Sequence, residues 1–279
     1  MIRNPITLLL GLGVAAAMVA AFAPLEVAML GVLAFAGPHN WFELRYLLGR
    51  LPSRLWVFRW YFVVATAGLV VLSFGSIAIS WFGHYRPQSV GLALLAPIWY
   101  TGLAGWIAVL LVLRFRERPV RPIGWIAPAA LAVAGLGWLW PAMMGLFLVY
   151  AHPLVALWFL DRELRARHRA LRPRYRRALW LVPAALGFIW LIAPAADAHA
   201  AIGSAVAEAI GRQAGANLFA GDPGRRLIAS HAFLELLHYS VWIVMIPMVA
   251  VRGRVWRIGD IPFGRNTRWL GLAVGGVLA

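Results

Sequence analysis

Apolar runs of about 20 residues, separated by short arginine-bearing segments, restrict what this chain can fold into more than any other feature. Of its 279 residues, 62% are hydrophobic and 13% are charged. A soluble domain averages about 25% charged residues. Backbone polar groups within lipid must be satisfied inside their own segment, so runs of this length are expected to be helices. The sequence therefore predicts an all-α, polytopic transmembrane helical bundle.

The apolar runs predict eight complete spans and one incomplete span. The complete candidates cover residues 5–22, 25–44, 60–82, 91–113, 122–137, 141–160, 178–196 and 228–251. A ninth run begins near residue 269 and reaches Ala279 before it is long enough to cross a bilayer. We therefore expect eight or nine spans in a single domain, residues 1–279, without an internal repeat.

The segments between the apolar runs are alternately rich and poor in arginine. All 26 basic residues are arginine, and a cytoplasmic N-terminus places 22 of them in cytoplasmic segments. The positive-inside rule then predicts a multi-pass protein of a bacterial inner (cytoplasmic) membrane with its N-terminus inside. The net charge of +16 is dispersed between apolar runs, so the expected partner is the lipid bilayer with its anionic headgroups and not nucleic acid. Asp161 and Glu163 are expected to balance the arginines that follow them.

One sizeable segment is expected on the outer face, residues 197–227. Its stretch 199–213 has apolar residues at helical spacing, at Ile202, Val206 and Ile210. That spacing predicts a short amphipathic helix lying on the membrane surface. The run Gly-Asp-Pro-Gly at 221–224 predicts a turn before the next span.

Several kinds of chemistry are excluded by what the sequence lacks. There is no cysteine, which excludes disulfides, thiolate metal sites and cysteine nucleophiles. There is also no phosphate-binding P-loop, dinucleotide fingerprint, hydrolase nucleophile elbow or zinc-protease motif. Candidate chemistry therefore rests on ionisable residues inside the apolar runs, where such residues are costly and usually functional.

The strongest such group is His231, Glu235 and His238 in the sequence HAFLELLHY. Offsets of four and seven residues place all three on one face of a helix. The histidines are candidate metal ligands, and Glu235 could ligate the same metal or orient a ligating histidine from behind. The alternative is a polar helix face that lines a wet gap between helices.

Two further histidines lie at comparable depth in other runs. His39 and Glu43 share a helix face; His39 could be a ligand with Glu43 orienting it, or a histidine with a local hydrogen bond. His152 precedes Pro153, which frees a backbone carbonyl that the imidazole could satisfy instead of a metal. Helical rise allows one buried site between the second, sixth and eighth predicted spans. The predicted metal ligands are His39, His152, His231, Glu235 and His238.

The segment Pro38-His39-Asn40-Trp41-Phe42-Glu43 resembles a motif of the Brp/Blh family of bacterial membrane β-carotene dioxygenases, Pro-His-Gly-x-x-Asp. It keeps Pro-His and the carboxylate four residues later and lacks the glycine. His231 and His238 resemble that family's late pair of histidines at different spacing, and its second histidine motif has no good match here. The resemblance implies a helical bundle whose buried histidines hold one iron that acts on a carotenoid.

Three functions remain open from the sequence. The first is an integral-membrane non-haem iron oxygenase with a lipophilic, carotenoid-like substrate. The second is a subunit that binds b-type haem or a pigment and transfers electrons, since paired histidines from different spans suit haem. The third is a cofactor-free structural subunit associated with other membrane subunits.

Overall fold

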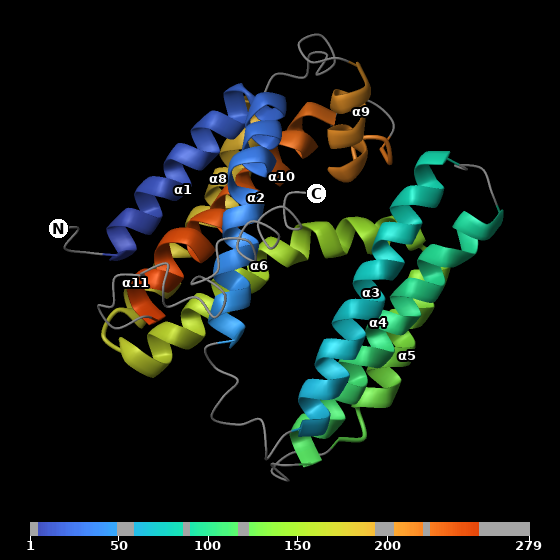
Figure 1. Ribbon diagram of the computed structural model, residues 1–279. Helices are drawn as coiled ribbons and strands as arrows, with labels where there is room; N and C mark the ends of the chain where they lie inside the picture. Colours follow the sequence, from blue (N-terminus) through green and yellow to red (C-terminus); the bar gives the residue numbers. More distant parts are fainter. Residues whose placement is uncertain are drawn as a thin grey trace, which may run out of the picture. The chain divides into compact units, whose positions relative to one another are not determined.

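The computed structural model describes residues 5–48, 59–85, 90–116, 123–192, 204–219 and 224–250 (Figure 1). These residues form helices and turns, with no strand among them. The all-helical prediction is therefore confirmed for this part of the chain. The predicted ninth span, the turn residues 221–223 and the beginning of the outer-face segment lie outside the described residues.

Six helical stretches are long and apolar enough to cross a membrane. They are Pro5–Phe22, Trp60–Gly83, Ala93–Arg116, Pro141–Arg167, Arg172–Ile192 and Gly224–Ala250. The predicted run 122–137 corresponds to α5 (Ile126–Leu139), whose 14 residues extend only about 21 Å. The predicted run 25–44 lies in α2 (Pro24–Leu48), where Pro38, His39 and Asn40 lower the mean hydropathy. The described residues thus support a membrane protein with at least these six candidate spans.

The chain divides into two compact units, which we describe separately. The first contains residues 1–47 and 146–279. Its helices are α1 (Pro5–Phe22), α2, most of α6 (Pro141–Arg167), α7 (Arg172–Ala178), α8 (Leu181–Ile192), α9 (Ser204–Gln213) and α10 (Gly224–Tyr239), followed by a π-helix, η1 (Ser240–Met245), and α11 (Ile246–Ala250). The second contains residues 48–145, with α3 (Arg59–Tyr85), α4 (Val90–Arg116) and α5.

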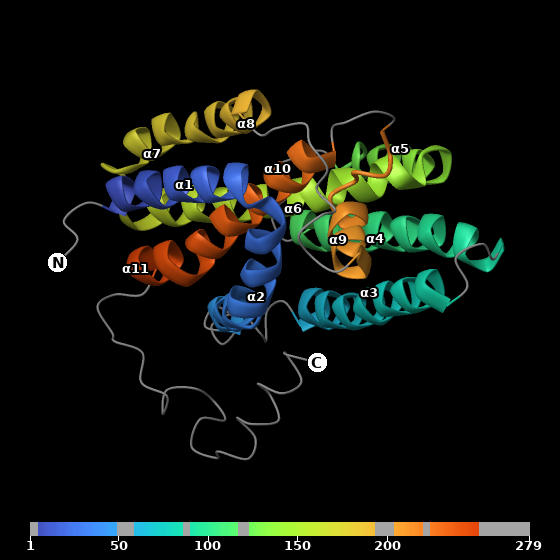
Figure 2. The same ribbon diagram turned by 90° about the horizontal axis from the view of Figure 1, so that it is seen from above.

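In the first unit, α1 packs along α8 and α10 (Figures 1 and 2). The C-terminal half of its buried face is made of small residues, with Ala16, Ala17, Ala20 and Ala21 all buried. Small side chains let helix backbones approach closely, which is how membrane helices gain packing contacts. The arrangement buries α10 more deeply than any other candidate span, with 61% of its best apolar window buried. His231 and His238 of α10 therefore lie in the protein interior.

The C-terminal part of this buried helix is irregular. The α-helical hydrogen-bond pattern of α10 gives way to a π-helix at Ser240–Met245, directly after the predicted ligand His238. The Ser240 hydroxyl donates to the Leu236 carbonyl at 2.8 Å. Short π-helical turns inside α-helices often occur at functional sites, so the backbone itself points to the region around His238.

Indole-to-backbone hydrogen bonds join the helices of the second unit. The Trp99 Nε1–H donates to the Leu72 carbonyl and the Trp106 Nε1–H donates to the Val64 carbonyl, both at 2.8 Å. Gly68 and Gly75 of α3 leave the space that the two indoles occupy. Much of the remaining surface of α3 is apolar and exposed, as at Leu69, Val71 and Phe74, which suits contact with lipid tails.

Candidate metal site

His238 is the most unusual side chain of the buried helix α10. Only 3% of it is exposed, yet neither ring nitrogen has a hydrogen-bond partner among the described residues. The backbone of Pro153 approaches the ring without reaching hydrogen-bond geometry. A buried polar group without a partner costs about 1–3 kcal/mol, and most such groups in native proteins have a protein, water or ion partner. His238 is therefore a candidate to bind an additional ligand.

His39 of α2 meets His238 across the first unit. It is 8% exposed, and the two ring centroids are 5.2 Å apart in an edge-to-face arrangement. The His39 Nδ1 lies 3.1 Å from the Phe35 carbonyl oxygen. Because a carbonyl can only accept, Nδ1 carries the proton and Nε2 presents its lone pair. A second hydrogen bond of this kind is how proteins orient a metal-binding imidazole.

Glu43, one helical turn after His39, completes a group of potential ligands. One ligand atom from each of His39, Glu43 and His238 lies within 4.8 Å of the other two. Two imidazoles and a carboxylate form the ligand set of non-haem iron(II) oxygenases, which leave positions open for substrate and oxygen. The sequence predicted Glu43 as a residue that orients a ligand from behind, whereas the structure places its carboxylate among the potential ligand atoms.

His152 of α6 adds a third imidazole beside the same group. Its ring centroid is 4.6 Å from that of His238. The side chain is exposed even though the neighbouring Pro153 is buried, so His152 lies at the edge of the site and not in its interior.

These side chains line a pocket of about 310 Å³. All of its walls belong to the first unit: His39, Leu148, Val149, His152, Pro153, Gln213, His231, Glu235, His238 and Tyr239. A concave site with a few convergent polar groups is the usual form of a small-molecule site.

The two remaining predicted ligands, His231 and Glu235, lie beside the group and not within it. Their side chains approach each other to 3.6 Å, from His231 Nε2 to Glu235 Oε1. Both line the pocket, but neither belongs to the described set of potential ligand atoms within 4.8 Å. Seven residues of helical rise separate His231 from His238, about 10 Å. The structure thus brings together His39, His152 and His238, with the Glu43 carboxylate near His39 and His238.

Two tyrosines near the site were not singled out from the sequence. The Tyr239 ring centroid lies 4.8 Å from that of His39 and 6.0 Å from that of His238. The Tyr150 ring packs on His231 at 5.8 Å, and its hydroxyl lies 3.1 Å and 2.9 Å from the carbonyl oxygens of Ala214 and Leu227. Their only sequence signal is position, since Tyr239 follows His238 directly and Tyr150 is two residues before His152.

The two acidic residues at the end of α6 have different environments. Asp161 accepts hydrogen bonds from Arg172 and Arg176, as expected for a residue that balances the arginine segment. Glu163 is fully buried and accepts a hydrogen bond from the Tyr46 hydroxyl at 2.6 Å. Glu163 also lies 3.4 Å from Arg167, so it pairs with the arginine segment as expected, and in addition its bond to Tyr46 joins α6 to α2.

Comparison of the chain with protein-family models, with curated proteins and with solved structures found no match. The functional argument therefore depends on the geometry of the histidine site.

Proposed function

We propose that this chain is an integral-membrane metalloprotein that holds one iron ion between α2, α6 and α10 and uses it to oxidise a lipophilic substrate. His39, Glu43 and His238 would be the ligands, with His152 as a fourth. The observation that carries the proposal is His238, a buried imidazole without a hydrogen-bond partner that lies against a second imidazole and a carboxylate. A metal ion would satisfy all three groups at once.

The ligand types favour iron and oxygen chemistry over a structural metal. Structural zinc sites are closed and are built mainly from cysteine and histidine. This group has no cysteine and includes a carboxylate, and histidine–carboxylate sets with open positions are typical of non-haem iron(II) oxygenases. A bound iron would supply the activation of molecular oxygen. The protein's own part is to hold the His39 Nε2 lone pair in place through the bond from Nδ1–H to Phe35, and to restrict water around His238 by burial.

The pocket lining supports a lipophilic substrate. Leu148, Val149 and Pro153 provide aliphatic contacts next to the three imidazoles. The pocket is built from helices that include two of the candidate spans, α6 and the stretch that begins with α10, so a molecule dissolved in the bilayer could reach it. The resemblance of residues 38–43 to the Brp/Blh motif makes a carotenoid the first substrate to test.

The proposal includes the membrane topology. We place the N-terminus in the cytoplasm of a bacterial cell, with eight or nine spans crossing the inner membrane. The distribution of arginine supports this arrangement, since it assigns 22 of 26 arginines to the cytoplasmic side.

The geometry of the rings argues against a haem bound by His39 and His238. Axial histidines lie on opposite sides of a porphyrin, so a flat macrocycle must pass between them. The two rings meet edge to face with centroids 5.2 Å apart, which leaves no room for it. A cofactor-free structural subunit is the other alternative, and the experiment below separates it from a metalloprotein.

The decisive experiment is metal analysis by mass spectrometry, together with an absorption spectrum, on the full chain purified in detergent after expression with iron. We expect stoichiometric iron and no Soret band. His39→Ala, Glu43→Gln and His238→Ala should each lose the metal, and His152→Ala should weaken its retention. His168→Ala is the matched control, because His168 is an exposed histidine in the turn between α6 and α7.

Each outcome has a definite meaning. Stoichiometric zinc would keep the metal site and reject the oxygenase. A Soret band would favour the haem protein, and no metal or chromophore would favour the structural subunit. Iron retained in full by folded His39→Ala and His238→Ala variants would reject this site.

A further inference from the structure

A second feature of the first unit, separate from the histidine pocket, is the turn between α6 and α7. Residues 161–177 contain eight arginines and two acidic residues, a net charge of +6 over a short stretch. Seven of these arginines are exposed. We infer that this arginine segment, residues 161–177, is a binding site for the phosphate headgroup of an anionic lipid.

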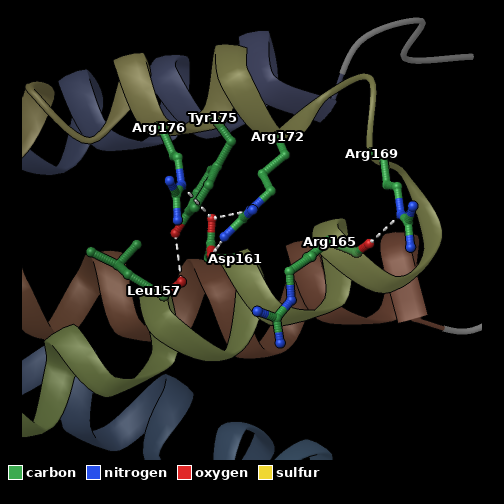
Figure 3. A network of polar contacts seen from close by, with 7 residues as sticks. All are labelled: Leu157, Asp161, Arg165, Arg169, Arg172, Tyr175 and Arg176. Atoms are coloured by element: carbon green, nitrogen blue, oxygen red, sulfur yellow. Dashed lines mark hydrogen bonds and ion pairs between the residues drawn. The ribbon is translucent and has the colours of Figure 1, made fainter.

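The segment is rigid and not a loose basic tail. Arg172 binds Asp161 through two nitrogens, at 3.0 and 2.8 Å, and Arg176 binds the same carboxylate at 3.1 Å (Figure 3). Tyr175, which is fully buried, donates from its hydroxyl to the Leu157 carbonyl at 2.7 Å. These contacts fasten α7 to the end of α6, so the arginines around them are presented from a fixed scaffold.

Both acidic groups of the segment are already engaged. Asp161 binds Arg172 and Arg176, and the buried Glu163 lies 3.4 Å from Arg167. Arg165, Arg174 and Arg177 have no ion-pair or hydrogen-bond partner for their guanidinium groups among the described residues. In Figure 3 the guanidinium group of Arg165 points away from Asp161. Three unpaired cations, carried on helices that are fastened together, can therefore receive an external anion.

The neighbouring tryptophans indicate that this anion is a lipid. Trp158 of α6 and Trp180 after α7 are 58% and 75% exposed, and exposed tryptophans mark the interface between hydrocarbon and headgroups. The Arg162 guanidinium lies 5.9 Å from the Trp158 ring centroid, already at that level. Arg165 follows Trp158 by seven residues, about 10 Å of helical rise, which reaches the headgroup region. Arginine matches phosphate geometry well, and basic residues at this level attract anionic lipids.

The test uses the full chain in a neutral detergent and measures lipid adducts by native mass spectrometry. Dioleoyl phosphatidylglycerol should bind at least tenfold more tightly than dioleoyl phosphatidylcholine. Arg165→Gln combined with Arg174→Gln should reduce phosphatidylglycerol binding at least tenfold. These side chains are exposed and unpartnered, so the thermal unfolding midpoint should not change. The charge-matched control is Arg116→Gln combined with Arg212→Gln, which removes the same charge from exposed residues elsewhere. Because Arg212 is paired with Glu208, the unfolding midpoint of the control is measured alongside its lipid binding.

Three results would overturn the inference. Equal loss of binding in the control pair would mean that net charge alone attracts the lipid. Displacement of phosphatidylglycerol by inorganic phosphate at low excess would mean that the site recognises free phosphate. Tighter binding of a short duplex DNA, with the same dependence on Arg165 and Arg174, would identify nucleic acid as the partner. These arginine substitutions lie outside the proposed iron ligands, so the iron content of the variants should not change. The inference can therefore fail without affecting the proposed function, and the reverse also holds.

Discussion

The two units differ in where they place polar groups. In the first unit, five polar or ionisable side chains are buried among the described residues: His39, Glu163, Ser230, His231 and His238. In the second unit, the interhelical polar contacts are mostly indole N–H groups that bind backbone carbonyls of a neighbouring helix. Indole contacts satisfy their own donors and need no ligand, whereas His238 lacks a partner. The difference places the candidate metal site in the first unit, whereas the indole contacts of the second unit serve packing.

The largest expected effect is the stabilisation by iron, which tests whether the His238 imidazole binds a metal ion. Adding iron(II) at about 1,000 times its dissociation constant should stabilise the wild-type chain by about 4 kcal/mol, seen as a higher unfolding midpoint in detergent. His238→Met removes the ligand and the unsatisfied nitrogens together. This variant should gain nothing from iron, while in metal-free buffer it should match or exceed the stability of the wild type.

The same measurement can contradict the comparison. If His238→Met is strongly destabilised in metal-free buffer, the imidazole already has a partner within the protein. The buried polar groups of both units would then be hydrogen-bonded within the protein, and His238 would be a structural residue.

The buried pair Tyr46 and Glu163 is expected to give the next largest effect. Tyr46→Phe removes the donor that lies 2.6 Å from a fully buried carboxyl oxygen, and a buried acceptor that loses its partner costs about 1–3 kcal/mol. Tyr61→Phe in α3 is the control, since no hydrogen bond of the Tyr61 hydroxyl is found among the described residues, and it should change stability by less than about 0.5 kcal/mol. Unfolding in mixed micelles by titrated dodecyl sulfate measures both. Equal losses of stability in Tyr46→Phe and Tyr61→Phe would show that the hydrogen bond between Tyr46 and Glu163 does not stabilise the first unit.

The fold could be predicted from the sequence more fully than the candidate site. Apolar run length predicted helices because each run can satisfy its own backbone. Helix faces and depth indicated that His39, His152 and His238 could be neighbours. The choice between Glu43 and Glu235 could not be predicted, since each lies one helical turn from a histidine. The crossing of α2 with α10 decides which carboxylate comes within 4.8 Å of the ligand atoms of both His39 and His238. The buried hydrogen bond between Tyr46 and Glu163 could not be predicted, because 117 positions separate the two residues in the sequence.

Packing in the second unit can be tested at Gly68. A methyl group there would occupy the place of the Trp106 indole, and overpacking costs about 1–3 kcal/mol. The better helix propensity of alanine offsets about 1 kcal/mol of this, so Gly68→Ala should lose up to about 2 kcal/mol. Gly105→Ala is the matched control, because its added methyl meets nothing within 4 Å, and it should be neutral or stabilising. Equal behaviour of the two variants would show that Trp106 does not rest against Gly68.

The smallest expected effect comes from the indole hydrogen bond itself. Trp106→Phe keeps an aromatic ring between α3 and α4 and removes the Nε1–H that binds the Val64 carbonyl. That carbonyl also accepts the ordinary helical bond of α3, so it does not become unsatisfied. Hydrogen bonds between membrane helices average about 0.6 kcal/mol, and the loss should be of that size, with Trp99→Phe giving a similar value. A loss above about 2 kcal/mol would exceed the largest values known for such bonds. Polar contacts would then contribute as much to the stability of the second unit as to that of the first, and the two units would not differ in this respect.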